Sequence, residues 1–197
     1  MSFRFALEKY IKSPESFPDL VIEYDDDFVL LRDAFPKSLY HWLLLPRDRH
    51  ITKKHPLTAF SDPLLKSQTQ ERIDRATSRI LELLKTDHGI DEGSLYVRAG
   101  CHSVPSLNNL HIHIISQDFN GDRLKNRHHY NSFTTEFFVP FDDLPLDKGD
   151  TRLNAEVMEK KAKTDDVICH NCGKNFGNKF AELKRHIHQE FKERFGK

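Results

Sequence analysis

Residues 109–115 read Asn109-Leu110-His111-Ile112-His113-Ile114-Ile115, and polar side chains alternate with apolar ones along most of this stretch. Successive side chains of a β-strand point to opposite faces of its sheet. The apolar side chains would therefore enter the core, while Asn109, His111 and His113 would share the other face. The stretch predicts a strand that presents two imidazoles and an amide on one surface.

This surface has the chemistry of phosphoryl or nucleotidyl transfer. A neutral imidazole can attack phosphorus, and neighbouring donors can stabilise the charge that builds on the phosphate oxygens. A second histidine can protonate the departing oxygen. The preceding loop supplies further candidates in His102, Ser103 and Ser106, which could fold over the same surface. From alternation alone, solvated surface histidines or metal ligands remain open as alternatives.

The segments around this strand predict an α+β domain. A hairpin is expected over residues 20–24 and 28–32, and further strands over 40–45, 95–99, 110–116 and 137–141. A short amphipathic helix is expected over residues 3–11. A long helix should begin at Asp62 and Pro63, a good N-cap and first-turn pair, and end near Lys85. Strands, a helix and then more strands favour an antiparallel sheet.

Length and charge allow one main domain with a small addition. The chain has 197 residues, of which 38% are hydrophobic. We assign residues 1–150 to the main domain, 151–166 to a connecting helix and linker, and 167–197 to a small C-terminal module.

Basic and acidic residues number 30 each, so any affinity for nucleic acid must be local. Residues 169–197 carry seven Lys or Arg against three Glu, a plausible phosphate-facing surface.

The C-terminal module has the ligand spacing of a zinc finger. Cys169 and Cys172 form a knuckle, and His186 follows in a segment with helical spacing, residues 180–195. The fourth ligand should lie four residues further on the same helix face, and that residue is Glu190. We expect one structural Zn²⁺ on these four residues, with Phe176, Phe180 and Leu183 as the core of the finger. A free cysteine pair in a basic tail is the alternative.

The cysteine content and the lack of long apolar segments bear on the cellular compartment in which we expect the protein. Three cysteines without an apolar signal segment suggest a reducing environment, and the longest apolar runs are too short to span a membrane. We therefore expect an intracellular protein without a membrane partner.

The histidine strand resembles the histidine-triad motif His-φ-His-φ-His-φ-φ, where φ is apolar. More narrowly, the sequence resembles the aprataxin family, histidine-triad DNA 5′-adenylate hydrolases that carry a C-terminal zinc finger. The resemblance covers nearly the whole chain and is strongest in residues 102–106, 113–119, 124–126 and 131–133. It implies a histidine-triad fold, with an antiparallel sheet and helices, followed by the finger.

The resemblance also implies roles for single residues. His111 matches the nucleophile that forms a nucleotidyl-histidine intermediate, His113 a ligand of phosphate oxygen, and His102 the histidine that assists the leaving group. Ser106 matches a hydroxyl that contacts phosphate. Asn109 stands at the first triad position and departs from the family pattern, since asparagine can form hydrogen bonds but cannot titrate.

Two further segments resemble those that cup the nucleoside, residues 30–36 and 41–46. In them Asp33 matches the carboxylate that takes the ribose hydroxyls, and His41 is a candidate nucleotide contact. Read without the family, Asp33 is a turn residue at a strand end.

Several residues are candidate DNA contacts. Phe3 and Phe5 could stack on a DNA end or pack inward, and we expect at least one of them to join the core. The basic candidates are Arg123, Lys125, Lys184 and Arg185.

The resemblance implies removal of AMP from 5′-adenylated DNA ends, the products of abortive ligation. The expected partner is nicked or broken DNA, the products are AMP and a restored 5′-phosphate, and no active-site metal is needed. We expect a monomer in the nucleus, with the cytoplasm as a second location. The preference among adenylated DNA, RNA–DNA junctions and guanylated ends stays open. The rival functions are hydrolysis of small nucleotides, such as dinucleoside polyphosphates, and nucleic-acid binding without catalysis.

Overall fold

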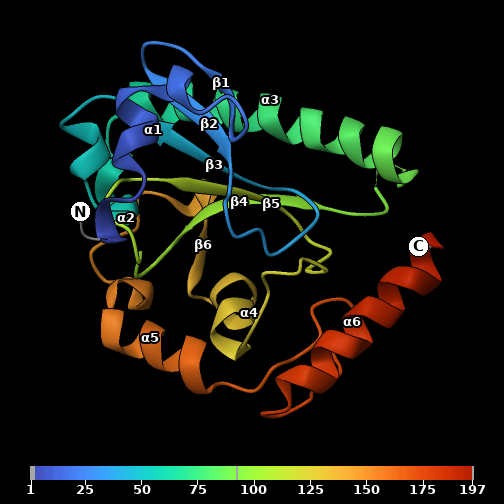
Figure 1. Cartoon of the computed structure of the whole chain (residues 1–197). Helices are drawn as coiled ribbons and strands as arrows, with labels where there is room; N and C mark the ends of the chain where they lie inside the picture. The colour runs from blue at the N-terminus through green and yellow to red at the C-terminus, as the bar shows by residue number, and fades with distance from the viewer. Residues whose placement is uncertain (1–2, 92, 197) are drawn as a thin grey trace.

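The computed structural model describes residues 3–91 and 93–196, and its central element is a six-stranded antiparallel sheet (Figure 1). The histidine strand β5 lies in the middle of the strand order β1-β2-β3-β5-β4-β6. The expected α+β class and antiparallel sheet are confirmed. The strands are β1 Val21–Tyr24, β2 Phe28–Arg32, β3 His41–Pro46, β4 Val97–His102, β5 Ile112–Ser116 and β6 Phe138–Pro140.

Helix α3, Pro63–His88, covers one face of the sheet (Figure 1). Asp62 caps its start by accepting a hydrogen bond from the backbone N–H of Leu64 at 2.9 Å, and Gly89 ends it in the left-handed conformation. Ile112 and Ile114 of β5 are buried in the core cluster on this side. Burying each such side chain contributes about 1.5–3 kcal/mol. The predicted inward face of the histidine strand is therefore confirmed.

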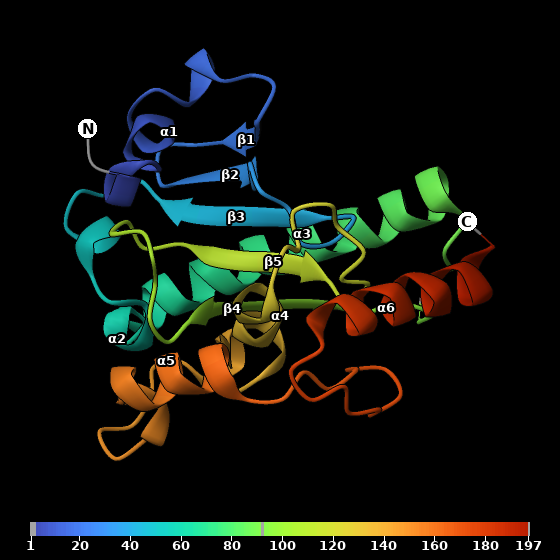
Figure 2. The same ribbon diagram turned by 60° about the horizontal axis from the view of Figure 1, so that its bottom comes forward.

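The other face of the sheet carries the remaining long helices (Figure 2). Helix α5 packs against α4, and Met158 and Ala162 of α5 are buried beside Phe137. The α-helices besides α3 are α1 Glu8–Lys12, α2 Pro56–Ala59, α4 Arg127–Thr134, α5 Ala155–Thr164 and α6 Phe180–Phe195. The 3₁₀ turns are η1 Phe3–Phe5, η2 Pro14–Ser16, η3 Ile51–Lys53, η4 Phe141–Asp143 and η5 Thr151–Leu153.

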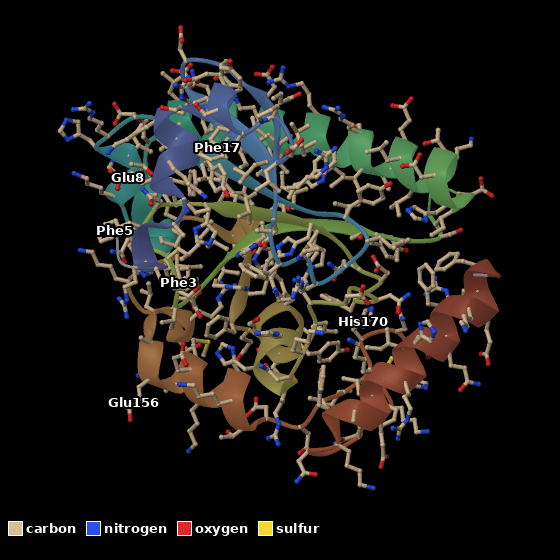
Figure 3. The ribbon with its side chains drawn as sticks, in the orientation of Figure 1. Phe3, Phe5, Glu8, Phe17, Glu156 and His170 are labelled. Atoms are coloured by element: carbon tan, nitrogen blue, oxygen red, sulfur yellow. The ribbon has the colours of Figure 1, made fainter. Side chains whose placement is uncertain are left out.

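The N-terminal segment differs from its prediction. The expected helix over residues 3–11 is divided into the turn η1 and the short helix α1. Tyr10 and Ile11 of α1 are buried, but the chain leaves α-helical geometry before them, so Phe3 and Phe5 do not share their face. Phe3 is 69% and Phe5 42% exposed (Figure 3). The prediction that one of them joins the core is wrong.

Strand β4 extends further than expected and places His102 at its end rather than in a loop. The extension pairs with β6, with Gly100 opposite Pro140 and His102 opposite Phe138. A Cβ atom on Gly100 would lie 2.3 Å from the carbonyl oxygen of Val139. Glycine therefore permits the close approach of the two strands, and His102 gains a fixed backbone position.

The C-terminal module shares a hydrophobic cluster with the sheet. Leu183 and Ile187 of α6 pack in one cluster with Ile115, Phe119 and other residues of the main domain, and Phe176 and Phe180 pack against it. Phe176, Phe180 and Leu183, the predicted core of the finger, do lie in one cluster, but that cluster continues into the main domain. The apolar residues of the C-terminal module and those of strand β5 and helix α4 thus form one core.

Among the described residues, no helix is both long enough and apolar enough to cross a membrane.

Candidate active site

Four histidines meet on the sheet face opposite α3. His111 directly precedes β5, His113 lies within it, His41 begins β3, and His102 ends β4. The ring centroid of His113 lies 5.0 Å from that of His111, 4.4 Å from that of His102 and 5.1 Å from that of His41. The structure therefore brings together histidines that are up to 72 positions apart in sequence.

The backbone fixes the protonation of His111. Its Nδ1 lies 2.7 Å from the carbonyl oxygen of Asn109. A carbonyl can only accept a hydrogen bond, so in the neutral ring Nδ1 carries the proton and Nε2 keeps its lone pair. The side chain is thereby set up as a nucleophile.

A second set of hydrogen bonds fixes the protonation of His113. The backbone N–H of Lys37 donates to His41 Nδ1 at 3.4 Å, so the proton of a neutral His41 lies on Nε2. His41 Nε2 lies 2.9 Å from His113 Nδ1 and donates to it. His113 consequently carries its own proton on Nε2. Asp33 lies beside this chain, with its Oδ2 3.6 Å from His41 Nε2.

Two fully buried imidazole nitrogens in the cluster lack a hydrogen-bond partner among the described residues. They are Nε2 of His113 and Nε2 of His102, and both are buried. Buried polar atoms almost always have a partner, so an empty pair beside a nucleophile indicates a place for a polar ligand. The acceptor oxygens of a phosphate would suit the N–H of His113.

The histidines are held in an apolar setting. The ring of Phe133, from α4, lies edge-on to those of His41, His102 and His113, with centroids 4.7–5.3 Å away. Burial lowers the pKa of His111, and it lowers the pKa of His41 to about 4. It takes the pKa values of His102 and His113 well below the usual range. The imidazoles are therefore neutral at pH 7, as a nitrogen nucleophile requires.

Asp33 lies on a loop that the segment after β5 holds in place. Its Oδ1 accepts the backbone N–H of Phe35 at 2.7 Å, which closes a tight turn. Downstream, Asp118 Oδ2 accepts the backbone N–H of Leu39 at 2.9 Å, and the backbone N–H of Gly121 donates to the carbonyl of Lys37. No local pattern in the sequence predicts this role of Asp118, because Leu39 lies 79 positions away.

The remaining predicted residues lie around this centre. Asn109 is buried and its Nδ2 donates to Thr52 Oγ1 at 3.2 Å, whereas Ser106 is exposed. Lys184 is half-buried and its Nζ donates to the carbonyl of Leu124 at 2.9 Å, so this ammonium ties α6 to the loop after β5. The other basic candidates, all exposed, are Arg123, Lys125 and Arg185.

The four predicted zinc ligands converge. Cys172 Sγ lies 3.2 Å from His186 Nε2, Cys169 Sγ lies 3.2 Å from Glu190 Oε2, and the four ligand atoms lie within 4.8 Å of one another. Zn²⁺ bonds of about 2.0–2.3 Å in tetrahedral geometry imply ligand separations of roughly 3.3–3.8 Å. Two thiolates, an imidazole and a carboxylate at this spacing fit a structural zinc ion.

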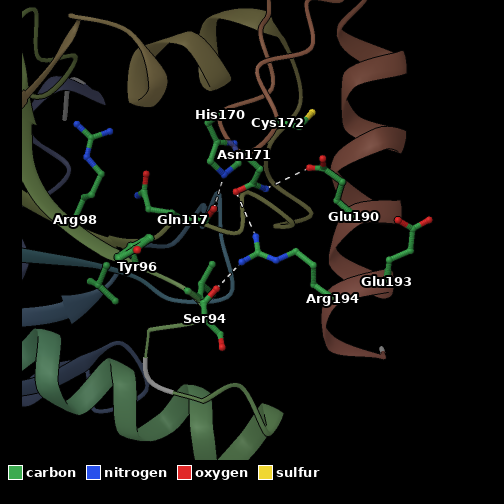
Figure 4. Close-up of a pocket in the computed structure, with 12 residues that line it drawn as sticks. Ser94, Tyr96, Arg98, Gln117, His170, Asn171, Cys172, Glu190, Glu193 and Arg194 are labelled. Carbon is green, nitrogen blue, oxygen red and sulfur yellow. Dashed lines mark hydrogen bonds between the residues drawn. The ribbon is translucent and has the colours of Figure 1, made fainter.

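The zinc knuckle is joined directly to the main domain. His170, between the two cysteines, places Nε2 2.6 Å from the carbonyl oxygen of Gln117, and its backbone N–H donates to the hydroxyl of Tyr130 at 3.0 Å. Arg194 of α6 donates to the carbonyl of Ser94 at 2.6 Å (Figure 4). These contacts border a cleft of about 870 Å³ between α6 and the sheet. Gln117 is four residues beyond His113, so the knuckle abuts the histidine strand.

The fold and the histidine cluster together define a histidine-triad hydrolase with an attached zinc finger. Two family models agree with this class. The one described as "Scavenger mRNA decapping enzyme C-term binding" matches residues 6–129, and the one described as a C2HE, C2H2 or C2HC zinc-binding finger matches residues 134–193.

Similar proteins narrow the class. An aprataxin-like protein of Saccharomyces cerevisiae is 40% identical and covers 99% of each chain, and one of Schizosaccharomyces pombe is 39% identical over 96% of this chain and 82% of its own. A crystal structure of the aprataxin ortholog Hnt3 in complex with DNA has a TM-score of 0.83 at 37% identity, covering 98% of this chain and 96% of that one. Hnt3 in complex with DNA and guanosine has a TM-score of 0.74 at 35% identity, covering 98% and 97%. The chain belongs to the aprataxin family.

Proposed function

We propose that this protein removes AMP from 5′-adenylated DNA ends through a covalent intermediate on His111. The observation that carries the proposal is the pairing of a free, lone-pair Nε2 on His111 with unpartnered Nε2 atoms on its neighbours His113 and His102. The DNA complexes of the Hnt3 ortholog support DNA as the carrier of the nucleotide. The proposal includes the nucleus as the place where the protein acts on such DNA ends.

In the first step, Nε2 of His111 attacks the α-phosphorus of the AMP group. The bond from that phosphorus to the bridging oxygen breaks, and the DNA leaves with its 5′-phosphate. The N–H of His113 donates to a phosphate oxygen and stabilises the charge that builds in the transition state. His102, on the adjacent strand, can donate a hydrogen bond to the departing oxygen, which leaves as part of the anionic 5′-phosphate.

In the second step, water attacks the same phosphorus and loses a proton to the solvent, and the bond to His111 breaks. AMP leaves, and His111 regains its neutral form for the next cycle. Asp33, beside His41, is the acceptor available to the ribose hydroxyls, and through His41 it adjoins the hydrogen-bond chain to His113. Binding of the nucleoside and orientation of the phosphate ligand are thereby linked.

The zinc ion has a supporting role in this proposal. When bound, it holds the four ligands of the finger together and so fixes the knuckle against Gln117 and Tyr130.

The experiment measures AMP release from a nicked duplex with a 5′-adenylate, beside diadenosine tetraphosphate at equal concentration. We expect a much higher kcat/KM on the DNA, and a labelled AMP adduct on the protein after quenching with denaturant at alkaline pH, which preserves a phosphorus–histidine bond. His111→Ala should abolish release and adduct but keep DNA binding, whereas the control His50→Ala, at an exposed position, should behave as wild type. Preference for the dinucleotide would contradict the DNA substrate, and turnover by His111→Ala would contradict the nucleophile.

A further inference from the structure

The cleft between α6 and the sheet gives access to one of the four zinc ligands. Cys172 is exposed and forms part of the wall of this cleft of about 870 Å³, whereas Cys169 is only 1% exposed. The thiolate is the reactive form of cysteine, and zinc binding keeps both sulfurs in that form. The two sulfurs lie within 4.8 Å of each other. An accessible thiolate with a shielded one beside it is the arrangement that thiol–disulfide exchange requires.

The same cleft carries charged groups that the zinc site does not use. Arg98 comes from β4, and Glu193 and Arg194 come from α6 (Figure 4). Arg98 donates to the carbonyl of Phe133 at 3.3 Å, and Arg194 donates to that of Ser94 at 2.6 Å. Neither guanidinium pairs with a carboxylate among the described residues. Their remaining N–H groups suit the carboxylates of a ligand, and Glu193 suits an ammonium group.

We propose that Cys172 is a modification site for glutathione disulfide, and that the cleft beside α6 binds this disulfide. Glutathione is a small peptide that carries carboxylates and an ammonium group, so its charges match those of the cleft wall. The cleft volume of about 870 Å³ lies within the usual range of ligand sites, about 300–1,000 Å³. This inference goes beyond the proposed function, because it concerns the zinc ligands and involves no nucleotide.

The exchange takes place in two steps. The thiolate of Cys172 attacks one sulfur of glutathione disulfide, the S–S bond breaks, and one glutathione leaves as a thiolate. The thiolate of Cys169 then attacks Cys172 Sγ in the mixed disulfide, and the second glutathione leaves. The two cysteines are oxidised to a disulfide, the glutathione disulfide is reduced to two thiolates, and these take up protons from water. His186 and Glu190 alone are too few ligands to hold zinc, so the protein releases it.

The modification reaches the histidine strand through the knuckle. His170 lies between the two cysteines, and its Nε2 lies 2.6 Å from the carbonyl oxygen of Gln117, just beyond β5. Loss of zinc removes the constraint that keeps His170 in this place. An oxidised glutathione pool would thereby loosen the segment that follows the histidine strand.

The test treats the zinc-loaded full chain with glutathione disulfide or with bis(2-hydroxyethyl) disulfide, which is neutral and has no carboxylates. Zinc release is followed with a coloured chelator, and the modified cysteines are located by mass spectrometry. We expect an early glutathione adduct on Cys172, and then a Cys169–Cys172 disulfide with release of zinc. The buried Cys101 should stay unmodified and serves as an internal control.

The role of the cleft is tested by the rates. Each rate of zinc release is divided by the rate at which a free cysteine peptide reacts with the same disulfide. We expect glutathione disulfide to be about tenfold faster than the neutral disulfide on this scale. Arg98→Gln/Arg194→Gln should remove this preference and keep the rate with the neutral disulfide. Arg75→Gln/Lys192→Gln, at exposed positions outside the cleft, is the charge-matched control and should keep the preference.

Three outcomes would overturn the inference. An early adduct on Cys169, or no zinc release with either disulfide, would exclude Cys172 as the site. Equal normalised rates in the wild type would show that the cleft does not recognise glutathione. A preference that survives in Arg98→Gln/Arg194→Gln would show that the guanidiniums do not bind the disulfide. None of these measurements uses a nucleotide, so their result is independent of the test of AMP release.

Discussion

His111 receives its reactive tautomer from a backbone carbonyl, and this explains how the site accommodates Asn109. The first position of the histidine-triad motif is a histidine, and its replacement by asparagine removes a titratable group. The proton of His111 Nδ1, however, is accepted by the main-chain oxygen of residue 109, which any amino acid supplies. The side chain at this position is therefore free for another role, and in this protein it lines a cleft of about 560 Å³ beside the N-terminal segment.

The buried histidines make folding stability depend on pH. Burial lowers the pKa of His41 from 6.5 to about 4, and it also takes the pKa of His102 well below that of an exposed imidazole. Below pH 6.5, these histidines therefore bind protons in the unfolded chain but stay neutral in the folded chain. Their contribution to stability is complete above pH 6.5 and is lost as the pH falls toward 4.

We predict that His102→Phe flattens this dependence. A phenyl ring suits the setting of Phe133 and Phe137 and cannot take up a proton on unfolding. The free energy of unfolding, measured in urea at pH 7.5, 6.0 and 5.0, should fall less steeply than in wild type, by up to about 1.4 kcal/mol per pH unit. An unchanged slope would show that His102 is not a buried neutral histidine. His50→Gln serves as the control at an exposed position.

At this scale, alternation in the sequence predicted which residues face the site but not how they are joined. The period of two placed His111 and His113 on one face correctly. The contact of His41 with His113 depends on β3 pairing with β5, a strand order that no local pattern encodes. The roles of Lys37 and Thr52 depend likewise on backbone positions that only the folded chain brings close.

The elements of the fold were predictable where local signals are strong. Helix α3 begins as Asp62 and Pro63 predict, and it continues past the expected end near Lys85 to His88, where Gly89 terminates it. The hairpin β1–β2 and helix α6 follow their patterns. The pattern of residues 3–11 predicts one helix, but only Glu8–Lys12 is α-helical, and its buried residues are Tyr10 and Ile11.

The loop between β2 and β3 depends on one glycine of the segment after β5. A Cβ atom on Gly121 would lie 2.5 Å from the carbonyl carbon of Lys37 and 2.7 Å from the backbone nitrogen of Ser38. These are main-chain atoms and cannot turn aside. The close packing sets the position of the loop that bears Asp33.

We predict that Gly121→Ala displaces this loop and weakens nucleotide binding. Overpacking of this kind costs about 1–3 kcal/mol in the free energy of unfolding. The KM for an adenylated substrate should rise more than kcat falls, because Asp33 moves while His111 does not. Gly149→Ala is the matched control, since its Cβ would meet nothing within 4 Å. Equal KM values for the two variants would show that the loop does not need this contact.

For the molecule as a whole, zinc should stabilise the histidine site as well as the finger. The finger shares its hydrophobic cluster with Ile115 and Phe119, and the knuckle is hydrogen-bonded to Gln117 and Tyr130. Sequence spacing predicted four side chains that the structure does bring together, but it could not show that the cluster of the finger continues into the main domain. That property depends on which apolar residues of the main domain remain uncovered.

We predict that zinc removal impairs the chemistry on a small substrate that does not reach the finger. Chelation at neutral pH should lower Tm in a single transition. It should also reduce kcat on an adenylated deoxynucleoside 5′-phosphate by about tenfold or more, and added Zn²⁺ should restore both. Glu190→Ala should resemble chelation, whereas Glu190→His should retain zinc and activity. Two separate unfolding transitions, or full activity after chelation, would contradict the coupling.

The shared cluster also bears on the order of events during synthesis. A ribosome delivers the strands of the sheet first and helix α6 last. Ile115 and Phe119, which pack with Leu183 and Ile187, therefore stay uncovered while the final thirty or so residues emerge. The histidine strand can reach its finished setting only after translation has passed the zinc ligands. Cells short of zinc would then accumulate newly made chains with that surface open to chaperones and proteases.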